Sequence, residues 1–251
     1  RDAQESRGLG DVYKRQYVAT VLPGASAALI RDTEFGGDAF VGLQVQSHTH
    51  NPGRDLAFAL NWVKNNEPGA TLESTAADGT EPKLEELIDA SATLDVQVHQ
   101  DFEWWIPEGA QVTPQIAQSL RAANDSVIES HQVGEDITGA AFWANAGGGK
   151  AHIRWVRPTD DESAFLNALA RVAARGELNL GEDTKFAGVF RTHGLIAPVF
   201  DLDPEVDHTS YEDHLTRVDK ALEEEISNDA QLSADECKQL ENIKSRQVTL
   251  R

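Results

Sequence analysis

Two histidines one residue apart, His48 and His50, form the clearest metal-ligand pattern in the sequence. They follow a run of alternating residues at 39–46. Alternate side chains of a strand share a face, so both imidazoles could reach one ion. A metal centre needs further ligands, but the sequence has no His-Glu-x-x-His or Cys-x-x-Cys pattern to supply them. We therefore predict no metal ion and no cofactor, and interpret the pair as a polar loop before the helix start at Asn51 and Pro52.

The glycines at 147–149, followed by Lys150, resemble part of a phosphate-binding loop. The full pattern requires Gly five residues before the last Gly and Ser or Thr after the Lys, where this sequence has Ala144 and Ala151. We expect a hairpin turn here instead. The single Cys237 lies in a predicted acidic helix, where nothing would activate its thiol. Since there is no nucleophile elbow either, we name no catalytic residue and favour a protein that is not an enzyme.

Cationic and aromatic residues gather on the predicted strands of the second half of the chain. They are Arg154, Trp155, Arg157, Arg191 and His193. In an acidic chain these residues could form a site for a small anion, as a binder or as an enzyme. They could equally be the solvent-facing side of the strands, paired with nearby acids. We take Arg154, Trp155, Arg191 and His193 as the candidate binding residues.

A dense aromatic group, Phe102, Trp104, Trp105 and Ile106, stands in the first half. Such residues could stack against a ligand or a partner's aromatic side chain, but they usually bury as core or as a seam between elements. This group, the acidic surface and the lack of a catalytic motif favour a non-enzymatic cytoplasmic module that binds a protein partner.

Composition excludes several classes of protein. The 251 residues carry 22 Lys and Arg against 42 Asp and Glu, a net charge of −20, which argues against binding duplex nucleic acid. One cysteine excludes a disulfide scaffold. No apolar run approaches the roughly 18 residues that a membrane span needs. The 40% of apolar residues fit a globular chain with a sizeable core.

The N-terminal stretch RDAQESRGLGDVYKRQ, residues 1–16, has no periodic apolar face, and the chain contains no Met. The stretch resembles translated sequencing adapter at the ends of metagenomic gene fragments, so we expect a non-native, unpacked tail. The alternative is a flexible natural tail.

The patterning predicts an α+β fold with largely antiparallel sheet. Strands are expected at 17–22, 27–30, 39–46, 94–99, 139–146, 150–157, 185–191 and 195–201. Helices are expected at 54–65, 83–89, 113–124, 160–175 and 211–226, with capping boxes at 159–162 and at 233–236, where a last helix opens. We predict a single domain over 17–251, with possible sub-halves 17–131 and 132–251 that each contain a strand–turn–helix repeat.

The predicted hairpin at 185–201 is apolar on both faces, which favours a central place in its sheet with helices nearby. Phe165, Leu169 and Val172 are expected to pack from the helix at 160–175. Pro198 cannot donate to a strand ladder, so one side of its strand should be unpaired or bulged there. We expect this break to turn Arg191 and His193 towards one rim, where a binding site would lie.

Six segments carry a family resemblance. They are VATVLP (18–23), VGLQVQ (41–46), RDLAFAL (54–60), HIRWVRP (152–158), FRTHGLIAPVFDL (190–202) and SRQVTLR (245–251). Together they resemble an actinobacterial family of uncharacterised proteins, a domain-of-unknown-function family. The resemblance implies a cytoplasmic protein, and in intact members a basic N-terminal tail that could associate with nucleic acid. It carries over no catalytic residue.

Overall fold

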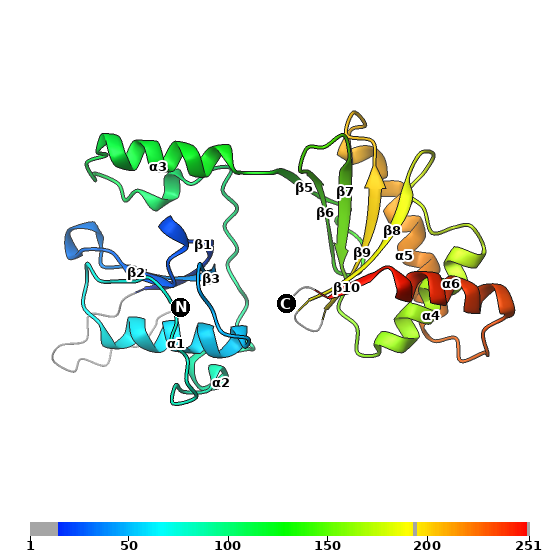
Figure 1. Ribbon diagram of the computed structural model, residues 1–251, viewed down its shortest axis with the longest axis horizontal. Helices are drawn as coiled ribbons and strands as arrows, with labels where there is room; N and C mark the ends of the chain where they lie inside the picture. The colour runs from blue at the N-terminus through cyan, green and yellow to red at the C-terminus, as the bar shows by residue number, and fades with distance from the viewer. Residues whose placement is uncertain (1–14, 193–194, 250–251) are drawn as a thin grey trace, which may run out of the picture. The chain divides into compact units, whose positions relative to one another are not determined.

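The computed structural model describes residues 15–192 and 195–249 and divides the chain into two compact units. The first unit extends to Val127 and the second begins at Ile128, four residues before the boundary that we predicted between the sub-halves. Each unit has its own mixed sheet and helices (Figure 1), so the predicted α+β class is confirmed.

The first unit is built on a four-stranded sheet in the order β1-β3-β2-β4. Its strands are β1 (Gln16–Val21), β2 (Ala28–Ile30), β3 (Ala39–Gln44) and β4 (Thr71–Leu72). β1 runs parallel to β3, and the other pairs are antiparallel. Gln16 pairs with Ala39, so the last residue of the predicted unpacked tail is part of the sheet.

Helix α1 (Pro52–Asn65) covers one face of this sheet. The Asn51 side chain accepts a hydrogen bond from the Arg54 backbone N–H at 3.1 Å, and Pro52 stands at the first helical position, as predicted. The stripe of Ala59, Leu60 and Val63 packs on the buried residues of β2 and β3. Two further helices, α2 (Leu84–Leu87) and α3 (Pro114–Asp125), follow in the same unit.

The second unit is a six-stranded sheet in the order β10-β8-β9-β7-β6-β5. Its strands are β5 (Glu129–Val133), β6 (Ala140–Asn145), β7 (Ala151–Val156), β8 (Lys185–Thr192), β9 (Leu195–Leu202) and β10 (Gln247–Thr249). Only the β10–β8 pair is parallel among these ladders. The glycines at 147–149 all have positive φ and form the predicted hairpin turn between β6 and β7.

Three helices pack on one face of this sheet (Figure 1): α4 (Glu162–Ala174), α5 (Glu212–Ile226) and α6 (Ala234–Ser245). Phe165, Leu169 and Val172 of α4 are fully buried in the core, as predicted. The capping box at 233–236 is also confirmed. The one predicted at 159–162 is wrong, because Asp161 is the N-cap and the Glu162 carboxylate is held by Arg191.

The β8–β9 hairpin has the predicted central position, with β9 between β8 and β7. The β7–β9 ladder ends at Arg154 and Val199 and resumes, in the same register, at the bridge from Arg157 to Ile196. Pro198 lies in the gap, because it has no N–H to donate towards β7. The expected break is therefore present. On its other side, β8 carries a bulge between Phe186 and Gly188.

Candidate functional site

The structure does not bring the predicted cationic cluster together. Arg154 is exposed on the sheet face opposite α4–α6, with its guanidinium 5.9 Å from the Phe190 ring centroid. Trp155, the next residue, points to the other face and is fully buried. Arg191 lies on the helix-covered face and pairs with Glu162. His193 lies outside the described residues.

The bulge in β8 separates the two arginines. Phe186 faces the core, where its ring contacts Phe200 edge-on at 5.6 Å. Simple alternation from Phe186 would put residue 191 on the opposite face, beside Arg154. The extra residue of the bulge shifts the alternation by one and puts Arg191 on the helix side instead. Arg154 and Arg191 therefore cannot share one anion.

Arg157 belongs to a buried structural network. Its side chain is 1% exposed and bonds to Asp219 and Glu223 of α5. Its guanidinium lies 4.6 Å from the Trp155 ring centroid. Asp219 also accepts from the Thr138 backbone N–H at 2.9 Å. Since every member has an internal partner, we assign this network to holding α5 against the sheet.

The two histidines of the metal pattern are both exposed in the loop before α1. His48 Nδ1 lies 2.8 Å from the Thr49 carbonyl oxygen. The loop is held by buried Asp55, which accepts from the Thr49 hydroxyl at 2.9 Å and the Thr75 hydroxyl at 2.7 Å. Within residues 15–192 and 195–249, no three His, Cys, Asp or Glu side chains converge as a metal site.

The aromatic group at 102–106 forms a seam on the sheet of the first unit. Trp105 Nε1 donates to the Val21 carbonyl oxygen at 3.2 Å, and the Phe102 and Trp105 rings stack at 4.3 Å. Arg31 donates to the Trp104 carbonyl oxygen at 2.8 Å. These aromatic side chains are half-buried, so the group is a seam between elements rather than an open stacking platform.

Residues 94–98, which we call the open segment, lie just before this seam. We predicted a strand at 94–99, but the structure has none there. The side chains of Leu94, Val96 and Val98 are 82%, 73% and 81% exposed. In the part of the chain that the structure describes, no backbone group of the open segment has a hydrogen-bond partner. The predicted alternation is real, but no neighbouring strand pairs with it.

The C-terminal end of the open segment contacts the seam, whereas its N-terminal end follows a local turn. Ahead of it, Asp89 accepts from the Ser91 hydroxyl at 2.6 Å and from the Ser91 backbone N–H at 2.9 Å. After it, the His99 ring stacks on Trp104 at 5.6 Å, and Trp104 is part of the seam. The segment thus presents three apolar side chains at alternate positions and free backbone groups, and it is held at its C-terminal end.

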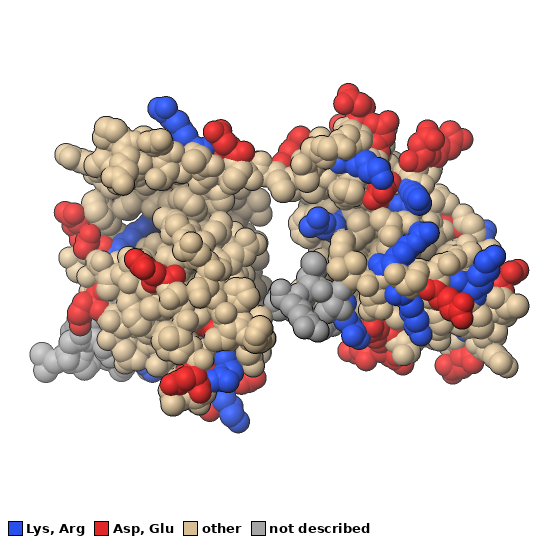
Figure 2. All heavy atoms as spheres, viewed as in Figure 1, with Lys and Arg blue, Asp and Glu red and all other residues tan. Residues whose placement is uncertain are grey.

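Charge is unevenly displayed on the face seen in Figure 2. The first unit shows mostly uncharged atoms there, whereas basic and acidic side chains are interspersed over the second unit. Uncharged surface with exposed apolar side chains is typical of a region that contacts another protein. No helix in the described ranges is long and apolar enough to cross a membrane.

The structure thus defines a two-unit α+β protein with an unpaired, exposed apolar segment in its first unit. A family model matches residues 7–251, and the chain belongs to that family, the family of unknown function DUF5926. The match includes residues 7–16 of the predicted non-native tail; residues 1–14 lie outside the described residues. No curated protein and no solved structure matches the chain.

Proposed function

We propose that this chain is a non-enzymatic module that binds a protein partner by strand addition at the open segment. The observation that carries the proposal is the 73–82% exposure of Leu94, Val96 and Val98 on a segment with free backbone groups. An unpaired extended segment is a template for another strand, whose backbone supplies affinity and whose side-chain pockets supply specificity.

The free energies of burial and of ordering favour binding by strand addition. Covering an exposed Leu or Val side chain stabilises a complex by about 1.5–3 kcal/mol. Ordering a free chain costs about 1–2 kcal/mol per residue, but the stacking of His99 on Trp104 already restrains the C-terminal end of the segment. The net charge of −20 favours a partner with basic residues beside its strand edge.

The test compares two variants with the natural sequence. The triple variant L94S/V96S/V98S removes the apolar side chains, and the control D95S/Q97S alters the intervening positions of the same segment. Each chain is used as bait in lysate from the source organism, and bound proteins are compared quantitatively. We expect a protein that the natural chain and the control capture and that the triple variant loses. Hydrogen exchange on the isolated complex should then show slowed exchange at residues 94–98.

Folding of the triple variant is checked by circular dichroism and thermal unfolding. Its three positions are exposed, so its stability should change by no more than about 0.5 kcal/mol per site. Equal capture by all three chains, or no captured protein at all, would refute the proposal.

Cellular location and nucleic-acid association stay predictions. The resemblance found in the sequence supports a cytoplasmic, actinobacterial protein, and association with nucleic acid through a basic tail in intact members. The small-anion function predicted for Arg154 and Arg191 loses its support, because these side chains lie on opposite faces of their sheet.

A further inference from the structure

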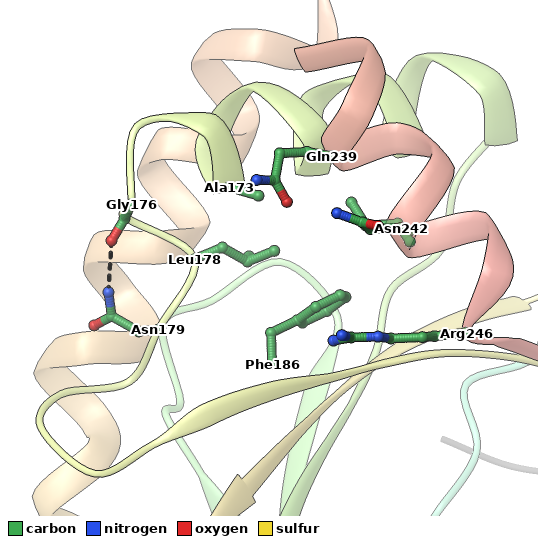
Figure 3. Close-up of a pocket in the computed structure, with 9 residues that line it drawn as sticks. Ala173, Gly176, Leu178, Asn179, Phe186, Gln239, Asn242 and Arg246 are labelled. Atoms are coloured by element: carbon green, nitrogen blue, oxygen red, sulfur yellow. Dashed lines mark hydrogen bonds between the residues drawn. The ribbon is translucent and has the colours of Figure 1, made fainter. Parts of the chain in front are cut away.

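The second unit contains a cavity that neither the family nor the open segment explains. It has a volume of about 260 Å³ and lies between α6, the end of α4 and the start of β8 (Figure 3). Leu178, Phe186 and Ile243 form its apolar side. Ligand pockets commonly measure about 300–1,000 Å³. This cavity is slightly smaller, so it suits only a small ligand.

The polar side of the cavity comes from one face of α6. Gln239, Asn242 and Arg246 are spaced by three and four residues, which brings them to the same side of the helix. In Figure 3, their side chains extend from α6 towards Leu178 and Phe186 across the cavity. Two carboxamides and one guanidinium therefore face an apolar wall.

In the described part of the chain, these three side chains have no hydrogen-bond or ion-pair partner. Within residues 15–192 and 195–249, neither carboxamide makes a hydrogen bond and no carboxylate pairs with Arg246. Arg175 of the same unit, in contrast, pairs with Glu225 at 2.5 Å. The guanidinium of Arg246 is therefore open to an anionic ligand.

Gly188 allows the end of α6 at Arg246 to lie directly against β8. The bulge in β8 gives Gly188 a φ of 147°, and a Cβ there would lie 2.6 Å from the Arg246 carbonyl oxygen. Directly after Arg246, Gln247 of β10 pairs with Val189 of β8. The end of α6 is therefore held against β8, which places the backbone of Arg246 beside the cavity.

We propose that this cavity binds a small carboxylate with an apolar body. A guanidinium recognises a carboxylate in a bidentate manner, and carboxamides can donate to it or accept from its substituents. The Phe186 wall suits an aromatic or branched body. The C-terminal end of α6 carries partial negative charge, so one guanidinium offsets a single negative charge better than the two of a phosphate dianion.

The experiment measures binding to the full chain by ligand-observed NMR titration. The probes are phenylacetate, its neutral analogue phenylacetamide and inorganic phosphate. Three variants each lower the net charge by one: R246Q and N242D change the cavity, and the control K244Q changes the same helix outside it. We expect saturable phenylacetate binding to the natural chain and K244Q, and at least tenfold weaker binding to R246Q and N242D.

The other measurements each support or overturn the proposed carboxylate site. Phenylacetamide should bind at least tenfold more weakly than phenylacetate. No saturable binding of phenylacetate, equal binding by R246Q or equal binding of the amide would overturn the site. Tighter binding of phosphate would overturn the carboxylate assignment. Circular dichroism of every variant verifies folding, and Lys244, Asn242 and Arg246 are all exposed, so these changes should be tolerated.

Discussion

Removing the charge of Arg157 should destabilise the second unit strongly. In the variant Arg157→Met the apolar stem remains, but Asp219 loses its cationic partner while only 9% exposed. Breaking a buried ion pair from one side costs about 3–5 kcal/mol, because the other charge stays buried. Asp219 keeps its bonds to Thr138 at 2.9 and 3.3 Å, so we expect a loss near the lower end, about 3 kcal/mol.

The variant Asp219→Asn should destabilise the unit less than Arg157→Met does. Asp219→Asn leaves Arg157 beside Glu223, so a counter-charge remains. This loss should be smaller, about 1–3 kcal/mol. Arg154→Met changes an exposed arginine of the preceding strand, β7. It is the matched control and should cost less than about 1 kcal/mol.

The assay is urea unfolding followed by tryptophan fluorescence and circular dichroism. The two units are analysed as separate transitions where their curves differ. A loss below about 1 kcal/mol for Arg157→Met, or a larger loss for Asp219→Asn than for Arg157→Met, would refute the assignment of Arg157 as a buried counter-ion.

Three further predictions follow from single contacts. Leu169→Ala should cost about 2–5 kcal/mol in urea unfolding, because the side chain is fully buried; a loss well under 1 kcal/mol would contradict its place in the core. Gly188→Ala should cost about 1–3 kcal/mol and weaken phenylacetate binding, since its Cβ would overlap the Arg246 carbonyl; unchanged values would show that this approach is unimportant. The hydrogen bond from Arg54 lowers the pKa of Glu81 from 4.5 to about 2, so the contribution of this pair is complete above about pH 4.5 and is lost as the pH falls through about 2. NMR titration should return this pKa towards 4.5 in Arg54→Gln, and an unchanged titration would exclude the contact.

Much of the second unit could be predicted from patterns among residues that are close together in the sequence. The apolar stripe of Phe165, Leu169 and Val172 indicates a helix by its spacing alone, and Pro198 marks a ladder break because it lacks a donor. The capping box at 233–236 is likewise a property of four neighbouring residues. Strands β5 and β10 were not predicted, because their short, polar sequences become strands only through the neighbours with which they pair.

The geometry of the candidate site could not be predicted from neighbouring residues in the sequence. The face on which Arg191 lies is decided by one extra residue in β8, and the only sequence sign of that bulge is Gly188. Leu94, Val96 and Val98 show the alternation of a strand, but pairing requires a free edge elsewhere in the fold. Gln239, Asn242 and Arg246 share a helix spacing that could have been noticed, although only the packing of α6 over Phe186 shows that a cavity lies beneath it.

The parallel pairing of β10 with β8 has a consequence for biosynthesis. The ribosome completes the first unit before it begins the second, and units of this kind fold as they emerge. β8 emerges near the middle of the second unit, whereas β10, which covers its outer edge, follows α5 and α6. Throughout that interval the nascent chain carries a bare strand edge that is prone to association with other chains. A stalled chain ending at Ser245 should therefore hold a folded first unit and depend on chaperones for the second.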